Sequence, residues 1–271
     1  ASQLPDTPEI RQARKESKRL KQLSLKHKRF GNYKEALSVA LKHLQITKEN
    51  FGENHIYTVD TLVSIAVLYE NQGRFSDAVQ LIKKSLRLYH DVLGAKHPET
   101  LASLYKLAYS YHSQGKYADA EKLFLKVLAI QQNVFGEKQC HTANTLGELA
   151  GLYEAQGRYS DAEPLLKKVL RRFQKSLGEK HPSTITAINN LAALFSSQGR
   201  YSEAEPLYKK AFNLSIKVQG ANHPETLISA FNLAAFYETL GRYSDAEPMY
   251  KKVLRLSQKN LGKKHPFTLS A

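Results

Sequence analysis

The chain has 271 residues, a formal net charge of +15 and 42% hydrophobic residues, enough apolar content for a folded core. No stretch approaches the roughly 18 uncharged apolar residues that a membrane-spanning helix needs, which argues against membrane insertion. The single cysteine, Cys140, cannot form an internal disulfide, so nothing indicates an oxidising compartment and the cytoplasm is the expected location.

The N-terminal part separates into residues 1–8, predicted to be a flexible segment, and a basic helix over residues 9–30. Residues 9–30 contain nine Lys and Arg residues but only two acidic ones, a net charge of +7. The positive electrostatic potential of such a segment suits an acidic partner, a nucleic acid or an anionic membrane surface. The basic patch expected on this helix consists of Lys18, Arg19, Lys21, Lys28 and Arg29.

From Gly31 onward the sequence repeats every 42 residues. The strings GRYSDAEPLLKK, GRYSEAEPLYKK and GRYSDAEPMYKK are near-copies of one another, and weaker copies precede them. A fixed period of this length predicts stacked copies of one supersecondary unit rather than two ordinary domains. The six copies begin at Gly31, Gly73, Gly115, Gly157, Gly199 and Gly241.

One helix of each repeat is predicted to begin just after this glycine. A serine followed three residues later by a glutamate is the pattern of a capping box, in which the two side chains satisfy exposed amides at the helix start. A proline follows each glutamate directly, and proline is tolerated near the first turn. The predicted boxes are Ser160–Glu163, Ser202–Glu205 and Ser244–Glu247.

A second helix completes each repeat. In the best-defined copy Gly178 ends one helix, His181–Pro182 begins the next, and apolar residues recur at helical spacing in both. Alanines 12 residues apart predict where the two helices of a hairpin approach most closely. These pairs are Ala66/Ala78, Ala108/Ala120, Ala150/Ala162, Ala192/Ala204 and Ala234/Ala246.

The repeat resembles the tetratricopeptide repeat, on the evidence of Leu104, Leu107, Ala108, Tyr111, Gly115, Tyr117 and Ala120, and its 42-residue form with LGxxHP between helices is similar to the kinesin-light-chain type. The resemblance implies an all-α, right-handed superhelical solenoid of six helical hairpins. The hairpins are expected at about 9–52, 53–94, 95–136, 137–178, 179–220 and 221–262, and residues 263–271 as the start of a seventh repeat or a C-terminal remnant.

The resemblance also implies a binding groove. In kinesin-light-chain arrays an L-N-N-L-A string on the first helix of a hairpin places asparagines in a concave groove that holds a peptide backbone. Similar strings occur here at residues 188–192 and 230–234, and an amide both donates and accepts hydrogen bonds, as a peptide group does. The expected groove residues are Ser64, Tyr105, Lys106, Tyr109, Asn144, Asn189, Asn190 and Asn232. Side-chain pockets formed by Tyr105, Tyr109 and Phe231 are expected to add specificity.

No motif predicts catalysis, and no cofactor or metal is expected. Histidines before proline recur one repeat apart, roughly 10 Å, which is too far for shared metal ligation. We expect these histidines to have capping or turn roles, and Cys140 to be structural. The histidines are His97, His181, His223 and His265.

The patterns favour a non-enzymatic scaffold that binds a protein or peptide segment, acidic segments included. One alternative is a sensor or regulatory arm of a larger protein. Another is a nucleic-acid-binding surface formed by the basic helix and a ladder of lysines, disfavoured because aromatic and basic residues do not interleave. The ladder is Lys84, Lys126, Lys168, Lys210 and Lys252.

Overall fold

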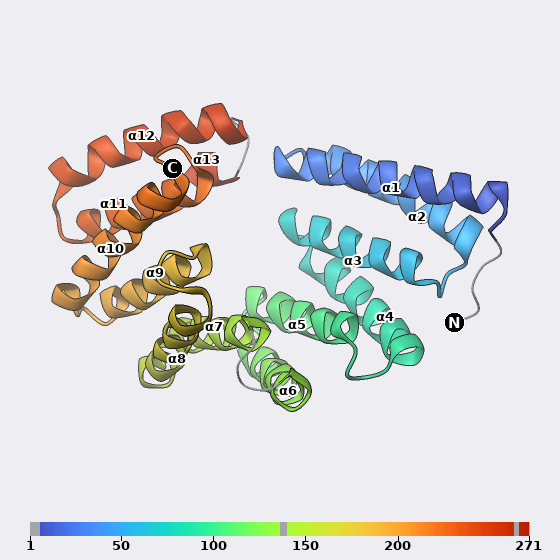
Figure 1. Ribbon diagram of the computed structural model, residues 1–271, viewed down its shortest axis with the longest axis horizontal. Helices are drawn as coiled ribbons and strands as arrows, with labels where there is room; N and C mark the ends of the chain where they lie inside the picture. Colours follow the sequence, from blue (N-terminus) through green and yellow to red (C-terminus); the bar gives the residue numbers. More distant parts are fainter. Residues whose placement is uncertain (1–5, 136–139, 263–265, 271) are drawn as a thin grey trace. The chain divides into compact units, whose positions relative to one another are not determined.

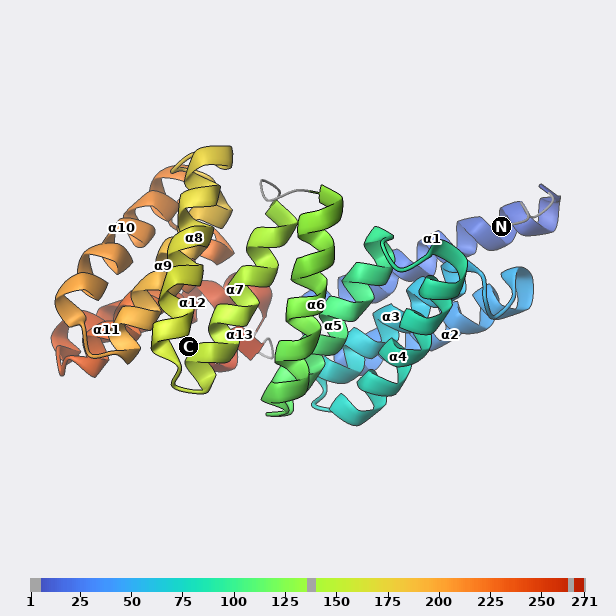
Figure 2. The ribbon, with the colours of Figure 1, turned by 90° about the horizontal axis from the view of Figure 1, so that it is seen from below.

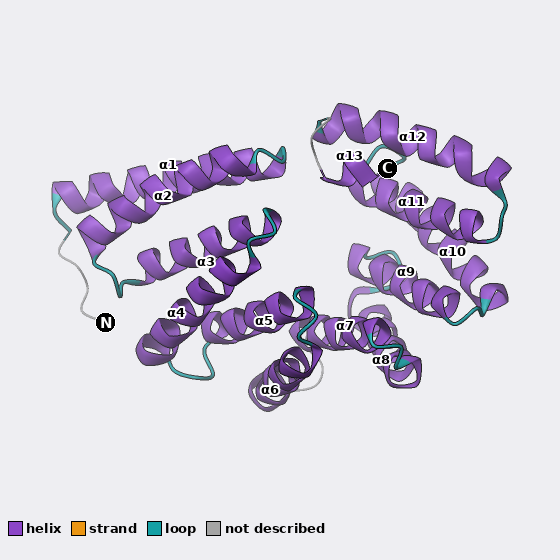
Figure 3. Cartoon of the chain, turned by 180° about the vertical axis from the view of Figure 1, so that it is seen from behind, coloured by secondary structure: helices purple, strands orange, loops and turns teal. Residues whose placement is uncertain are grey.

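The computed structural model describes residues 6–135, 140–262 and 266–270 (Figure 1). Within these ranges all regular secondary structure is helical, and no strand is present (Figure 3). The chain divides into two compact units, Ala1–Ile130 and Gln131–Ala271. The predicted all-α array of helical hairpins is confirmed within each unit.

The first unit contains five complete helices and the beginning of a sixth. Consecutive helices among the five pack on one another, and the ring of Tyr105 contacts that of Phe124 on the sixth helix, with 5.6 Å between the ring centroids. The helices are α1 (Pro8–Arg29), α2 (Tyr33–Phe51), α3 (Ile56–Asn71), α4 (Phe75–Leu93), α5 (Pro98–Ser113) and α6 (Tyr117–Phe135), the last of which continues into the second unit.

The second unit continues the same order of antiparallel pairs. Consecutive helices from α7 onward pack on one another, and α9 also contacts α11. Figure 2 shows the members of each pair side by side. The helices are α7 (Cys140–Ala155), α8 (Tyr159–Leu177), α9 (Pro182–Ser197), α10 (Tyr201–Gln219), α11 (Pro224–Thr239), α12 (Tyr243–Leu261) and the short α13 (Pro266–Ser270).

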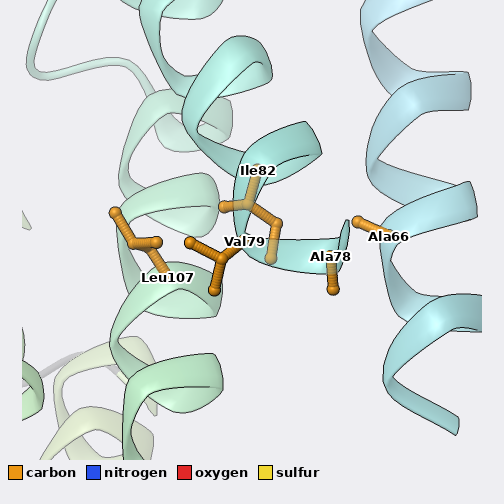
Figure 4. Packing of buried hydrophobic residues seen from close by; sticks show 5 residues of the cluster. All are labelled: Ala66, Ala78, Val79, Ile82 and Leu107. Carbon is orange, nitrogen blue, oxygen red and sulfur yellow. The ribbon is translucent and has the colours of Figure 1, made fainter. Parts of the chain in front are cut away.

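The paired alanines lie where the prediction placed them. All ten are buried, and Ala66 of α3 faces Ala78 of α4 (Figure 4). On the other side of Ala78, Val79 and Ile82 pack against Leu107 of α5, so one cluster joins a hairpin to the next helix. Small side chains at the crossing allow the usual interaxial distance of about 8–10 Å, and larger ones would force the helices apart.

The turn between hairpins depends on a glycine and a histidine. Gly178 has φ 86° and ψ 167°, a backbone region that is essentially restricted to glycine. Its carbonyl accepts a hydrogen bond from the Thr184 hydroxyl at 2.8 Å. The Nδ1 atom of His181 accepts the backbone N–H of Ser183 at 3.2 Å, satisfying one of the free amides at the start of α9.

The predicted capping role of the histidines is therefore confirmed where the structure describes them. His55, His97 and His223 make the same contact as His181, while His265 lies outside the described residues.

The predicted capping boxes are wrong. Helix α8 begins at Tyr159, with Arg158 at its N-cap and no side-chain capping bond, so Ser160 lies inside the first turn. The carboxylate of Glu163 turns away to pair with Lys167, at 2.6 Å. The proline that follows it lies inside the helix. The same holds at the N-termini of α10 and α12.

An arginine, rather than a serine, organises this turn. The Arg200 guanidinium lies 4.1 Å from the centre of the Phe195 ring. It also pairs with Glu203, at 2.7 Å, and with Glu163 of the preceding hairpin, at 2.7 Å. These carboxylates, Glu203 first, raise the pKa of Arg200. Equivalent stacked pairs are Arg74 on Tyr69, Arg158 on Tyr153 and Arg242 on Tyr237.

Candidate functional site

The first helix of each hairpin leaves one stripe of side chains uncovered, because its other faces pack on the second helix and on the neighbouring hairpins. Ser64 of α3 and Tyr109 of α5 are exposed in the first unit, as are Asn144 of α7 and Asn190 of α9 in the second. The predicted groove residues mostly lie on this stripe. The two units are described separately below.

In the first unit, two adjacent hollows lie along the α1–α3 interface; we call them the α1–α3 hollows. One has a volume of about 330 Å³ and the other about 230 Å³. They share Lys21, His43 and Ser64. The first is also lined by Arg14, Ser17, Lys18, Tyr57, Asp60 and Thr61, and the second by Ser24, Leu25, Lys28, Ala40, Val63, Val67, Leu68 and Lys106.

His43 of α2 forms the base of both hollows and is 6% exposed. Its Nε2 atom lies 2.6 Å from the Ser17 hydroxyl of α1, and its Nδ1 atom 3.3 Å from the Thr61 hydroxyl of α3. Thr61 donates its only hydroxyl proton to the Tyr57 carbonyl, at 2.7 Å. His43 therefore donates from Nδ1 to Thr61, and in its neutral form it accepts from the Ser17 hydroxyl at Nε2.

The electrostatic surroundings favour this neutral form. Burial lowers the pKa of His43, and the nearby Lys21 ammonium lowers it further, while Asp60 acts in the opposite direction. Asp60 itself accepts a hydrogen bond from the buried hydroxyl of Tyr89 on α4. The hollows thus combine a cationic rim with an uncharged polar base.

The second hollow brings two lysines from different helices together. Burial lowers the pKa of Lys28, and the Lys106 ammonium of α5 contributes to the shift. Glu70 lies close to both, but burial raises its own pKa and it accepts a hydrogen bond from Ser110.

The structure splits the predicted basic patch. Lys18, Lys21 and Lys28 line the hollows. Arg19 lines neither hollow and forms an ion pair with Glu16, with 2.6 Å between the charged atoms. Arg29 is exposed and lines neither hollow.

The aromatic residues expected to form side-chain pockets differ in how far they are exposed. Tyr105 is half-buried against Phe124, and Tyr109 is 44% exposed. Phe231, in the second unit, packs against Tyr250 and Phe267 and belongs to an interior cluster.

In the second unit, the asparagines occupy two different environments. Asn190 and Asn144 are exposed, Asn232 is half-buried, and none of the three is hydrogen-bonded to a described residue. Asn189 is 6% exposed, and its amide donates to the Ser229 hydroxyl of α11 at 3.0 Å. Asn189 therefore links α9 to α11 and differs from its predicted place on the open groove face.

His43 and Ser17 were not predicted to be functional, although the repeat contains a signal for both. Ser85 occupies the position of His43 one repeat later, and Val127, Val169 and Val253 occupy it in later repeats, while Leu101 and Ile185 occupy that of Ser17. Two polar residues in an apolar register, on neighbouring helices, indicate a buried polar cluster.

The described parts of the chain contain no group of three or more His, Cys, Asp or Glu side chains placed to hold a metal ion. None of their helices is long and apolar enough to span a membrane. Cys140 begins α7, and its side chain lies outside what the structure describes.

Stacked hairpins with a repeated exposed stripe define a helical-repeat protein. The sequence pattern of the tetratricopeptide repeat matches residues 24–89, 64–133, 141–217 and 198–259. The chain belongs to the tetratricopeptide repeat family, and its repeats are of the kinesin-light-chain type. A comparison with curated proteins found no matching sequence.

Solved structures share this fold. Nearly identical TPR-like repeats of a kinesin light chain from Podosopora anserina are 27% identical, with a TM-score of 0.59 over 74% of this chain and 95% of that one. BtubC from P. vanneervenii is 19% identical, with a TM-score of 0.67 over 86% and 94%. A Rap protein complexed with competence and sporulation factor is 12% identical, with a TM-score of 0.63 over 92% and 76%.

Proposed function

We propose that this chain is a non-enzymatic protein-interaction scaffold that binds a peptide segment of its partner on the exposed stripe of the first helices. The observation that carries the proposal is the pair of side-chain amides at Asn190 and Asn232, which repeat at one period and form no hydrogen bond with the described residues. An amide can bond both to the N–H and to the C=O of an extended chain.

The charge of the first unit favours acidic segments. Three lysines of α1 and one of α5 line the α1–α3 hollows, so an acidic partner would be attracted to the first unit at long range. The attraction should weaken as salt is added, because the screening length shortens to about 8 Å at physiological ionic strength. A nucleic-acid ligand would show a steeper salt dependence with little sequence preference.

The test is selection of peptides from a random display library, followed by affinity measurements on the selected sequences. We expect Asn190→Ala/Asn232→Ala to weaken binding about 5- to 150-fold, since each lost hydrogen bond is worth about 0.5–1.5 kcal/mol. Asn213→Ala is the matched control, because Asn213 is exposed on a second helix, α10. Equal affinities for the wild type and the double variant would refute the proposal.

A further inference from the structure

The α1–α3 hollows are a place where the chain departs from its own repeat. Ser17 stands where all later repeats have an apolar residue, and His43 stands where the next repeat has Ser85 and the later ones have Val or Ala. Together with Thr61 they form a hydrogen-bonded polar base between α1, α2 and α3. Later repeats bury apolar residues at most of these positions, so the repeat fold itself does not require a polar base here.

Within the described residues, the lysines that line the hollows form no ion pair, although Glu70 lies close to two of them, Lys28 and Lys106. Lys84, Lys167 and Lys210 each pair with a carboxylate, at 3.5, 2.6 and 3.2 Å. The four lysines that line the hollows form no ion pair with a described residue, and the acid in the first hollow, Asp60, already accepts a bond from Tyr89. The four are Lys18, Lys21, Lys28 and Lys106.

We propose that the α1–α3 hollows bind carboxylate side chains of an acidic peptide segment, and that protonation of His43 at their base tightens this binding. The inference rests on the proposed function, since it assumes that the chain is a peptide-binding scaffold. It adds a location, a ligand class and a dependence on pH.

The dimensions of α1 suit a short extended peptide. Arg14 and Lys28 are 14 residues apart on the same helix, which corresponds to about 21 Å. An extended chain covers that distance in about six residues. Two hollows rather than one continuous trough favour separate side chains entering from a backbone that lies above them. Lysines bind such carboxylates as point charges and require no fixed geometry.

Protonation would change both the charge and the hydrogen bonding of His43. The cation would donate from both ring nitrogens, so the Ser17 hydroxyl would have to rotate and accept from Nε2. Without a ligand the new charge meets more cations than anions. The groups around it are Arg14, Lys18 and Lys21 from α1, Tyr57 and Asp60 from α3, Tyr89 of α4 through Asp60, and Lys106 of α5 at the second hollow.

A bound carboxylate supplies the missing negative charge, so ligand binding and proton uptake favour each other. The coupling is reciprocal: the ligand makes protonation of His43 easier, and protonation strengthens binding by the same factor. One pKa unit of coupling corresponds to a tenfold change in affinity. We expect affinity to rise about three- to tenfold between pH 7.5 and pH 5.5, a range in which peptide carboxylates stay ionised.

The ligand class is tested with a fluorescein-labelled peptide of alternating Glu and Ser residues and its Gln-for-Glu counterpart, measured by anisotropy on the full chain. Lys21→Gln/Lys28→Gln should weaken the acidic peptide about fivefold or more. Lys15→Gln/Lys26→Gln is the matched control, since it removes the same charge from exposed positions of α1 that line neither hollow. Equal weakening by both pairs, or tighter binding of a single-stranded oligonucleotide, would overturn the site.

The pH dependence is tested with His43→Gln, whose amide can still bond to Ser17, and with His27→Gln as a control on α1. The rise in affinity at low pH should disappear only in His43→Gln. As a second readout, NMR titration of the wild-type imidazole should show its pKa rising when the acidic peptide is bound. A pH dependence unchanged in His43→Gln, or an unchanged imidazole pKa, would overturn the coupling.

These results are independent of the asparagine test. If Asn190→Ala/Asn232→Ala leaves selected peptides bound while Lys21→Gln/Lys28→Gln releases the acidic peptide, the proposed asparagine contact fails and the anion site stands. The opposite pattern refutes the anion site alone.

Discussion

Helix α7 contains two glycines that its fold does not require, and replacing them should stabilise the protein. Gly147 and Gly151 lie inside the helix, neither has a positive φ, and a Cβ added at either would meet nothing within 4 Å. Alanine there would lower the entropy lost on folding without creating a clash.

The expected gain follows from helix propensity. Alanine is favoured over glycine in a helix interior by about 0.5–1 kcal/mol, so Gly147→Ala/Gly151→Ala should raise the free energy of unfolding by about 1–2 kcal/mol. The midpoint of thermal unfolding should rise by about 2–8 °C, taking about 2–4 °C per kcal/mol for a chain of this size. Urea denaturation followed by circular dichroism would measure the gain directly.

The matched control is Gly157→Ala in the turn that follows α7. Gly157 has φ +71°, so alanine there is strained even though the space around it is open. It should destabilise by about 1–2 kcal/mol. If the helix variants lost stability, or if Gly157→Ala behaved like them, the reasoning from backbone conformation and free space would be refuted.

Three further changes have clear expected outcomes. Ala192→Leu, at a fully buried helix crossing, should destabilise by about 1–3 kcal/mol in urea, whereas Ala155→Leu at an exposed position should have little effect. Because the pKa of His43 is lowered on folding, the unfolded chain binds more protons than the folded chain below about pH 6.5, and the free energy of unfolding should fall on acidification. His43→Gln should show a smaller fall over the same pH range, and an equal fall in both proteins would contradict this. Arg200→Lys should lower the melting temperature more than Arg255→Lys, since Arg200, unlike Arg255, stacks on a ring and pairs with two carboxylates. Equal melting temperatures of the two variants would argue against that role of Arg200.

Much of the fold could be predicted because the residues that end and begin each helix recur at the same positions of successive repeats. Glycine at the hairpin junction is needed for a backbone conformation that other residues avoid, and its recurrence fixes the length of the unit. Histidine before proline likewise places each helix start, since its Nδ1 atom accepts a backbone N–H. Such features are local, so sequence spacing is enough to locate them.

Features that depend on a neighbouring helix were harder to predict. The S-x-x-E pattern fits a capping box, but the helix begins one residue before Ser160 because Arg158 stacks on Tyr153 and closes the turn. Two adjacent asparagines point in directions about 100° apart on a helix, so only packing decides that Asn189 turns to Ser229 while Asn190 stays open.

Because the turns that follow α8 and α10 have the same backbone conformation, the hairpin between them could be removed without changing the geometry of the junction. Gly178 and Gly220 have the same φ of 86°, and each is followed three residues later by a capping histidine. Excising residues 179–220 would join two equivalent turns and bring Arg242 to the same sequence distance from Glu163 that now separates it from Glu205. We therefore expect that the length of the proposed binding surface can be changed in steps of one hairpin, with the ion pair at the new junction re-formed between equivalent residues.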